Sequence, residues 1–197
     1  MGKNQIFAQH RRMLSIQRSV LQQIFEQSYY ASDLRAYAEE FVKELRLINT
    51  GGHQVSVDEI MENAVGWESI QHMEAEAREI YAGCLFVVLN DWIQSLGKTL
   101  SIKSGERLST GPLIGNVELA GLIWAAANNF RHYSEWKRNS AIDKRAKQSI
   151  DVLGSAGILN AQSQSCASVA LDLIGVGSYT ELEDKVLQIG TQLSEKI

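Results

Sequence analysis

A single proline, Pro112, interrupts the whole 197-residue chain, and long stretches on either side of it carry apolar residues at regular intervals. Proline removes a backbone N–H and stops helices, so its rarity leaves long helices free to form. The apolar residues recur three and four positions apart, which is the spacing of an amphipathic helix. The sequence therefore predicts an all-α fold.

About seven or eight helices follow from these stretches and the turn residues between them. They lie at 5–30, 34–48, 56–66, 67–96 and 116–138, with three more that begin near 140, 160 and 180. The residues expected to cap helix N-termini are Ser32-Asp33, Ser56 with Glu59, Asn116, Ser140 with Asp143, Asn160 and Thr180 with Glu183. Gly51-Gly52 and Gly175 or Gly177 are expected to end helices. Residues 97–116 form the one long irregular stretch, which is typical of a functional loop or a short strand-like excursion.

The stretch at 67–96 is the longest periodic run and predicts a helix that spans the core. Its expected core positions are Trp67, Ile70, Met73, Ala77, Ile80, Tyr81, Cys84, Leu85, Val88, Trp92 and Ile93. No internal repeat and no shift in composition divides the chain. We therefore expect residues 1–197 to form a single-domain helical bundle.

The two cysteines, Cys84 and Cys166, lie inside apolar helical patterns and have no partner at metal-ligand spacing. Buried, reduced thiols of this kind are typical of a cytosolic protein. The N-terminal residues lack the apolar core of a signal peptide, and the longest apolar run, at 81–89, is too short to span a bilayer. We expect a cytoplasmic protein that makes no membrane contact.

The net charge of −4 hides an uneven distribution of charge along the chain. Residues 1–25 carry four basic residues and no acid, and residues 131–147 carry six basic residues against two acids. Residues 53–91 reverse the balance, with eight acids against one arginine. If the two basic segments come together, they form a positive surface on an acidic protein. The alternative is a set of separate, solvated helix faces.

Residues 125–136 concentrate the polar groups suited to proton transfer and anion contact. Asn128 and His132 are four positions apart, so they lie one helical turn from each other on one face. Arg131 and Glu135 have the same spacing on a neighbouring face, and Trp136 extends the first line by a turn. This segment is the candidate functional site, although Arg131 with Glu135 also has the spacing of a surface ion pair and Trp136 suits core packing.

The segment 126–136 resembles the alanine-Asn-aromatic-basic-His-x-x-Glu-Trp segment of HEPN-like helical proteins. Those proteins are associated with bacterial toxin–antitoxin, abortive-infection and other phage-defence systems. The HEPN ribonuclease signature is an arginine, a polar residue, three variable residues and a histidine. Asn128 and His132 occupy the polar and histidine places, whereas Ala127 stands in the place of the arginine.

The resemblance implies a metal-independent endoribonuclease that needs no cofactor and acts at the cleft of a homodimer. His132 would be the base, Arg131 would place positive charge on the phosphate, and Asn128 would orient the imidazole or donate to a phosphate oxygen. Glu135 and Trp136 would support the motif. The residues expected to line an RNA groove are Lys137, Arg138, Lys144, Arg145 and Lys147.

Two other functions are compatible with the same residues. Because Ala127 replaces the arginine, the chain is also typical of a non-catalytic binding or dimerisation module with a cognate protein partner. A helical-bundle metal protein is the third hypothesis, since Glu68, His72 and Glu76 align on one helix face. The duplicated Glu-x-x-His pattern of di-metal bundles is absent from the sequence, and we expect no metal site.

Overall fold

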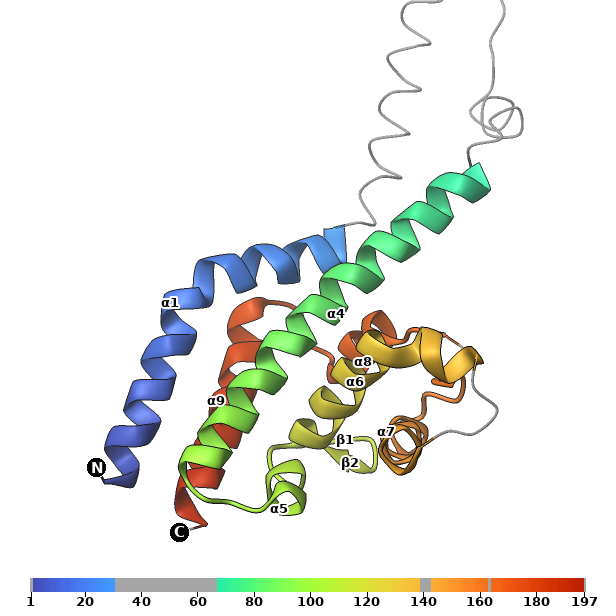
Figure 1. The fold of residues 1–197 in the computed structure, drawn as a ribbon. Helices are drawn as coiled ribbons and strands as arrows, with labels where there is room; N and C mark the ends of the chain where they lie inside the picture. Colours follow the sequence, from blue (N-terminus) through green and yellow to red (C-terminus); the bar gives the residue numbers. More distant parts are fainter. Residues whose placement is uncertain (1, 31–66, 139–142, 163, 197) are drawn as a thin grey trace, which may run out of the picture.

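The structure of the chain is a computed structural model that describes residues 2–30, 67–138, 143–162 and 164–196. Within these ranges it contains seven helices and one two-stranded antiparallel sheet (Figure 1). The elements are α1 (Lys3–Tyr30), α4 (Trp67–Thr99), α5 (Ser104–Leu108), β1 (Leu113–Ile114), β2 (Val117–Glu118), α6 (Leu119–Arg138), α7 (Lys144–Ser155), α8 (Ala167–Ile174) and α9 (Tyr179–Glu195). The predicted all-α class is confirmed. The helices expected at 34–48 and 56–66, with their caps, lie outside the described residues.

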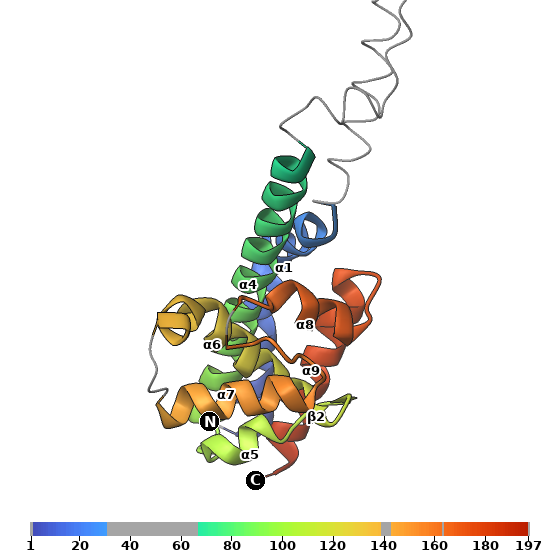
Figure 2. The same cartoon turned by 90° about the vertical axis from the view of Figure 1, so that its right-hand side faces the viewer.

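The two longest helices, α1 and α4, pack along each other, and α9 packs against both (Figures 1 and 2). Their facing sides bury large apolar side chains, among them Phe25 on α1 with Phe86 and Ile93 on α4. The indole Nε1 of Trp92 donates to the backbone oxygen of His10 at 2.8 Å. This hydrogen bond satisfies the one polar atom of a buried tryptophan and attaches α1 to α4.

The first half of α6 lies at the centre of the fold, in contact with α4, α5, α7 and α8. Every residue from Leu119 to Asn129 is buried, as expected for a helix that is largely apolar on all sides. Gly83 lets α6 approach α4 closely, because a β-carbon at that position would lie 2.1 Å from the Phe130 ring. Beyond Phe130 the helix leaves the core, and Trp136 is its one later buried residue.

The predicted cap at Asn116 is wrong, because this residue lies in the turn between β1 and β2. Gly115 adopts a φ of +60°, which permits the tight turn, and Leu113–Ile114 pair with Val117–Glu118 before the helix begins. The N–H of Leu119 then donates to the oxygen of Pro112 at 2.9 Å. The strand-like excursion expected within 97–116 is present, extended by two residues.

The C-terminal helices match the predicted boundaries only in part. Asp143, predicted as the partner of a Ser140 cap, is itself the N-cap of α7, its Oδ1 accepting from the backbone N–H of Ala146 at 2.7 Å. Ser140 lies outside the described residues. Asn160 begins no helix, since α8 starts at Ala167, after a segment that hydrogen-bonds to Asn129 in the middle of α6. The predicted helix end at Gly175 is confirmed, with a left-handed φ of +63°.

The cap of α9 lies earlier than predicted. Ser178, rather than Thr180, accepts from the backbone N–H of Glu181 at 3.3 Å, and the Glu181 carboxylate accepts from the N–H of Gly177 at 2.9 Å. Ser178 and Glu181 are a serine and a glutamate three positions apart, which is the pattern of a capping box. The competing pair of Thr180 and Glu183 faces α1 instead, where Arg18 contacts both side chains.

One prediction about the cysteines is wrong. Cys166 is buried as expected, but Cys84 is exposed on the outer side of α4. Ile80 and Tyr81, also expected in the core, are 53% and 37% exposed. The periodicity of α4 therefore includes an apolar stripe on the solvent side as well as the one that faces the core.

Within the described residues, the stretch Glu74–Thr99 of α4 has the length and hydropathy of a membrane-spanning helix. More than half of its most apolar window (56%) is buried inside the protein, which is equally characteristic of a core helix.

Candidate functional site

The polar segment singled out in the sequence occupies the second half of α6, where the helix passes from the core to the surface (Figure 1). Its side chains are therefore divided between two environments. Asn128 and Asn129 are buried, whereas Arg131, His132 and Glu135 are exposed. Whether these groups can act together depends on the partners that each one has.

Asn128 contacts α7 rather than His132. Its side chain is 6% exposed, and Nδ2 donates to Oγ of Ser149 at 3.2 Å. Ser149 Oγ in turn donates to the backbone oxygen of Arg145 at 3.2 Å. A buried amide with a hydrogen-bonded partner stabilises the packing of two helices, so this arrangement joins α6 to α7.

His132 forms an exposed pair with Glu135. Its Nδ1 lies 3.2 Å from Oε2 of Glu135, and the two side chains are 47% and 67% exposed. The ion pair expected between Arg131 and Glu135 is wrong, because Arg131 turns towards α4 and binds Asp91 with N–O distances of 3.2 and 3.3 Å. The packing of α4 against α6 places the Asp91 carboxylate, rather than that of Glu135, within hydrogen-bonding distance of the Arg131 guanidinium.

Two further residues of the motif are buried. Trp136 is 8% exposed, which confirms that it packs into the protein. Ala127 is 0% exposed, so the position that corresponds to the HEPN arginine faces the core. The described residues around that position offer no space for a solvated cation at the same place.

The basic residues expected to contact RNA are all exposed, at the end of α6 and the start of α7. The other basic segment lies on α1, on the opposite side of α4 from α7 (Figures 1 and 2). Arg18 of that segment pairs with Glu183 of α9 at 3.3 Å. The two basic segments therefore do not form the joint positive surface considered above.

The proposed metal ligands on α4 do not form a cluster in the part of the chain that the structure describes. His72 Nε2 lies 3.2 Å from Oε1 of Glu76 in an exposed pair, and the side chain of Glu68 lies outside the described residues. Across these ranges no group of three histidine, cysteine or acidic residues is placed to hold a metal ion.

A buried polar cluster that sequence reasoning missed lies beside the motif. Asn129, 0% exposed, donates to the backbone oxygens of Ala161 and Gln164 at 2.6 and 3.2 Å and accepts from the N–H of Cys166 at 3.0 Å. The same amide oxygen accepts from the Cys166 thiol at 3.2 Å. Burial, followed by the Glu79 carboxylate, raises the pKa of that thiol to about 12. This cluster holds the loop before α8 against α6.

Glu79 of α4 completes the same junction by capping α8. Its carboxylate accepts from the backbone N–H groups of Ala167 and Ser168 at 2.5 and 2.9 Å and from the hydroxyls of Ser165 and Ser168 at 2.5 and 2.7 Å. A carboxylate at a helix N-terminus satisfies donors that the helix itself cannot. The signal in the sequence was one serine just before α8, Ser165, and one in its first turn, Ser168, but nothing indicated that the acceptor comes from α4.

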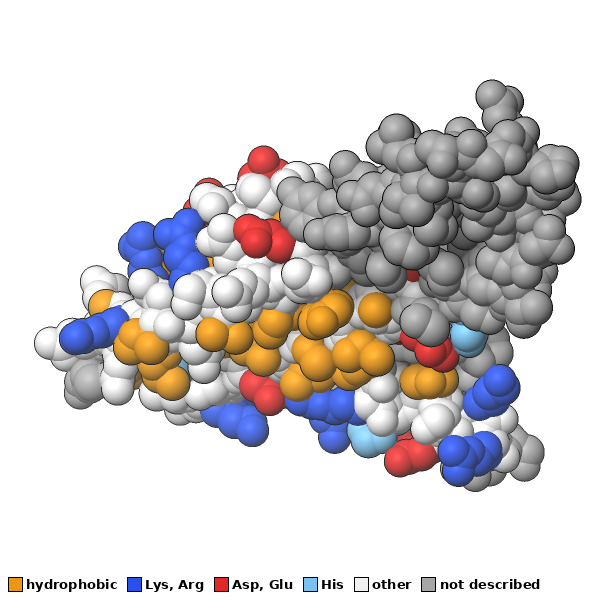
Figure 3. All heavy atoms as spheres, turned by 90° about the horizontal axis from the view of Figure 1, so that it is seen from above, with side chains coloured by type: hydrophobic (Ala, Val, Ile, Leu, Met, Phe, Trp, Pro, Cys, Tyr) orange, Lys and Arg blue, Asp and Glu red, His pale blue; other side chains and the backbone are white. Residues whose placement is uncertain are grey.

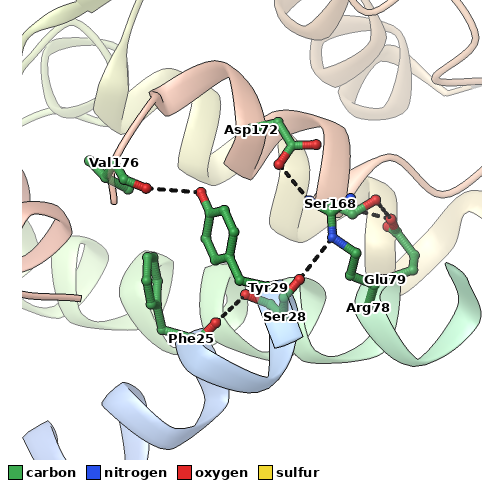
Figure 4. Close-up of polar contacts among 8 residues, drawn as sticks. All are labelled: Phe25, Ser28, Tyr29, Arg78, Glu79, Ser168, Asp172 and Val176. Atoms are coloured by element: carbon green, nitrogen blue, oxygen red, sulfur yellow. Dashed lines mark hydrogen bonds and ion pairs between the residues drawn. The ribbon is translucent and has the colours of Figure 1, made fainter. Parts of the chain in front are cut away.

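The adjoining residues attach α1 to α4 and α8 (Figure 4). Arg78 donates to the backbone oxygen of Ser28 at 2.9 Å and to Asp172 at 2.5 Å, and the Tyr29 hydroxyl donates to the backbone oxygen of Val176 at 3.1 Å. Burial, with the charge of Asp172, raises the pKa of Tyr29, although Arg78 lowers it in part. Each of these contacts is structural.

No protein-family model, curated protein or solved structure matches this chain. The resemblance to HEPN-like proteins rests on residues 126–136 and remains a prediction. The geometry of the site is therefore the basis for its function.

Proposed function

We propose that this chain is a non-catalytic, cytoplasmic binding and dimerisation module, HEPN-like in its motif and of the kind found in bacterial toxin–antitoxin and phage-defence systems. The observation that carries the proposal is the position of Asn128. Its amide is buried and donates to Ser149 of α7, whereas the imidazole of His132, which it would have to orient, pairs with Glu135.

The positive group required for phosphate chemistry is also engaged elsewhere. Arg131 donates to both carboxylate oxygens of Asp91, and the position of the family's arginine is a buried alanine, Ala127. A ribonuclease of the HEPN type needs an amide, a cation and an imidazole around one phosphate. The partners of these three groups support a binding role over a catalytic one.

A separate feature supports binding. Exposed apolar side chains gather in a band that is visible in Figure 3, with charged side chains along its lower edge. Large exposed hydrophobic residues on the two long helices include Met13, Ile16 and Val20 of α1 and Ile80 and Tyr81 of α4. A contiguous apolar patch with a charged border is typical of a protein–protein contact surface. We call these residues, with Ala77, Cys84, Val87 and Val88, the apolar face.

One observation favours the alternative, a metal-independent endoribonuclease. His132 is 47% exposed and lies beside Glu135, so its imidazole is open to a substrate, with Arg131 next to it in sequence and Lys137, Arg138, Lys144, Arg145 and Lys147 exposed nearby in the chain. The affinity for an RNA bound there would fall steeply as the salt concentration rises, because the contacts would be to phosphates.

Cleavage of a single-stranded RNA by the purified chain distinguishes the two functions. We expect no cleavage by the wild type above that of His132→Ala, and no toxicity on expression of either. His72→Ala is the matched control, since His72 also forms an exposed pair with a glutamate, Glu76, at the same 3.2 Å. Cleavage that disappears in His132→Ala but persists in His72→Ala would establish the enzyme and refute our proposal.

A further inference from the structure

The outer side of α4 is apolar over three turns in the middle of the helix. The residues that form it are Ala77, Ile80, Tyr81, Cys84, Val87 and Val88. Ile80, Tyr81 and Cys84 are exposed, and the other three are half-buried. Their spacing of three and four residues places them in one stripe along the helix, and this stripe forms the centre of the apolar face.

Among the described residues, the helices that pack against α4 leave this stripe open. Ser95, seven residues beyond Val88, lies 3.4 Å from the His10 ring of α1, and Asp91, seven residues beyond Cys84, binds Arg131 of α6. Residues seven apart lie on nearly the same line of a helix. The stripe therefore runs between α1 on one side and α6 on the other, with its centre towards solvent.

We infer that the occupant of the apolar face is a second copy of this chain, whose α4 packs antiparallel across a twofold axis near residues 81–84. This inference rests on the proposed function, because it names the partner of the proposed binding module. A twofold axis midway between residues 81 and 84 makes the two α4 helices run in opposite directions. It places Tyr81 of one copy opposite Cys84 of the other, and Ala77 opposite Val88. Large side chains then face small ones, which is the pattern that lets two helices interdigitate.

This self-match is what a twofold interface requires. In such an interface the same patch of both subunits must be complementary to itself. Four of the six stripe residues meet this requirement, because Ala77 exchanges places with Val88 and Cys84 with Tyr81 on reversal. Ile80 and Val87 instead come level with residues 85 and 78 of the other copy, beside the line of the four.

The charges at the border of the stripe are complementary in the same arrangement. Glu76 is 63% exposed and, on reversal about the same axis, comes level with residue 89 of the other copy, close to that copy's Asp91–Arg131 pair. Both Glu76 and Arg131 lie towards the α6 side of the stripe. Arg131 uses one terminal nitrogen on Asp91, so its other N–H groups are available to the second carboxylate. Each guanidinium would then lie between two acids.

Cross-linking through Cys84 tests the register of this dimer. The chain has two cysteines, and Cys166 is buried, so a short bismaleimide reacts with the folded protein at Cys84. Near the axis two copies of Cys84 are close enough to be joined. We expect a covalent dimer from the wild type at micromolar concentration and none from Cys84→Ser. A dimer by light scattering that gives no cross-link would overturn the inference, because the contact would then use another face.

Substitution of the stripe tests the contact itself. Tyr81→Glu places a charge in the apolar contact, and we expect it to raise the dissociation constant at least about 30-fold. Leu159→Glu is the matched control, since Leu159 is 87% exposed and lies outside the apolar face, and it should leave the dimer unchanged. The thermal midpoint of each variant, measured as the monomer, shows whether it folds.

Charge reversal identifies the partner of Arg131. Glu76→Lys and Arg131→Glu should each weaken the dimer about 5-fold, and the double variant should regain most of the affinity. A double variant as weak as the product of the single ones would exclude this register. A wild type that is monomeric at micromolar concentration would overturn the dimer but not the non-catalytic function, whereas cleavage of RNA that depends on His132 would overturn that function and not the dimer.

Discussion

The second half of α6 and the outer side of α4 lie next to each other, joined by Arg131 and Asp91, yet they differ in a way that bears on function. On α6 the polar groups that suggest chemistry already have partners inside the protein. On the outer side of α4 the apolar side chains are exposed, and no other described part of the chain covers them. Exposed apolar residues in a contiguous patch need an explanation, whereas polar residues with satisfied hydrogen bonds do not. The comparison therefore identifies the outer side of α4, rather than the motif on α6, as the candidate binding surface.

The largest effect is expected at Asn129, which lies one residue from the predicted catalytic amide. Asn129→Leu keeps the branched shape of the side chain but removes the partner of the buried Ala161 carbonyl, the Gln164 carbonyl and the N–H of Cys166. It should lower the free energy of unfolding by about 3 kcal/mol. Urea denaturation measures this loss. His132→Ala, three residues further on, should change the same quantity by less than about 0.5 kcal/mol. Equal losses from both would mean that the exposed half of α6 is as structural as the buried half.

Two adjacent residues of α4 give the next comparison, because Glu79 faces inwards and Ile80 outwards. Glu79→Gln weakens the cap of α8 by removing the charge that four donors share, and should cost about 1–2 kcal/mol of stability. Ile80→Gln should leave the stability of the monomer nearly unchanged and weaken self-association instead. Thermal unfolding of the monomer and light scattering separate the two effects, and a folding loss from Ile80→Gln as large as that from Glu79→Gln would contradict the outward position.

The fold class and the longest helices could be predicted because periodicity and the lack of proline act locally. The division of α6 into buried and exposed polar residues could not be predicted in this way. Asn128 and His132 share a line of the helix, and only the arrival of α7, with Ser149, determines that the first is buried and the second is not. The stripe on α4 was mistaken for core for a related reason: Ile80, Tyr81 and Cys84 have the same residue types and spacing as Leu85, Phe86 and Leu89, and only the packing of α1 and α6 separates the two sides.

A smaller effect is expected from pH at Cys166, in contrast to the exposed Cys84. The pKa of the buried thiol is about 12 against an ordinary value of 9.0. Above pH 9 the unfolded chain loses this proton while the folded chain keeps it, so the unfolded state binds fewer protons and stability falls as pH rises from about 9 towards 12. The contribution is fully present below pH 9 and about 1 kcal/mol of it should be lost by pH 10.

Comparison with Cys166→Ala isolates this contribution from that of the tyrosines, since burial and the charge of Glu183 also raise the pKa of Tyr179. The variant should lose less stability between pH 8 and pH 10 than the wild type, as measured by urea denaturation. Identical slopes would show that the thiol ionises freely in the folded protein and that the cluster around Asn129 is open to solvent.

The smallest effect is expected at Arg131, which connects the two regions compared above. Its pair with Asp91 is exposed on both sides, at 35% and 65%, and exposed pairs contribute about 0–1 kcal/mol because water and salt screen them. Arg131→Ala should therefore change the unfolding free energy of the monomer by less than about 0.5 kcal/mol, and this small difference should vanish in 0.5–1 M salt, where the Debye length is only a few ångströms (about 3 Å at 1 M). A loss above about 1.5 kcal/mol that persists in salt would mean that the pair holds α6 on α4, and Arg131 would then serve the fold rather than a partner or a phosphate. The measurement thus decides whether Arg131, which links the motif to α4 beside the apolar face, is available to bind anything else.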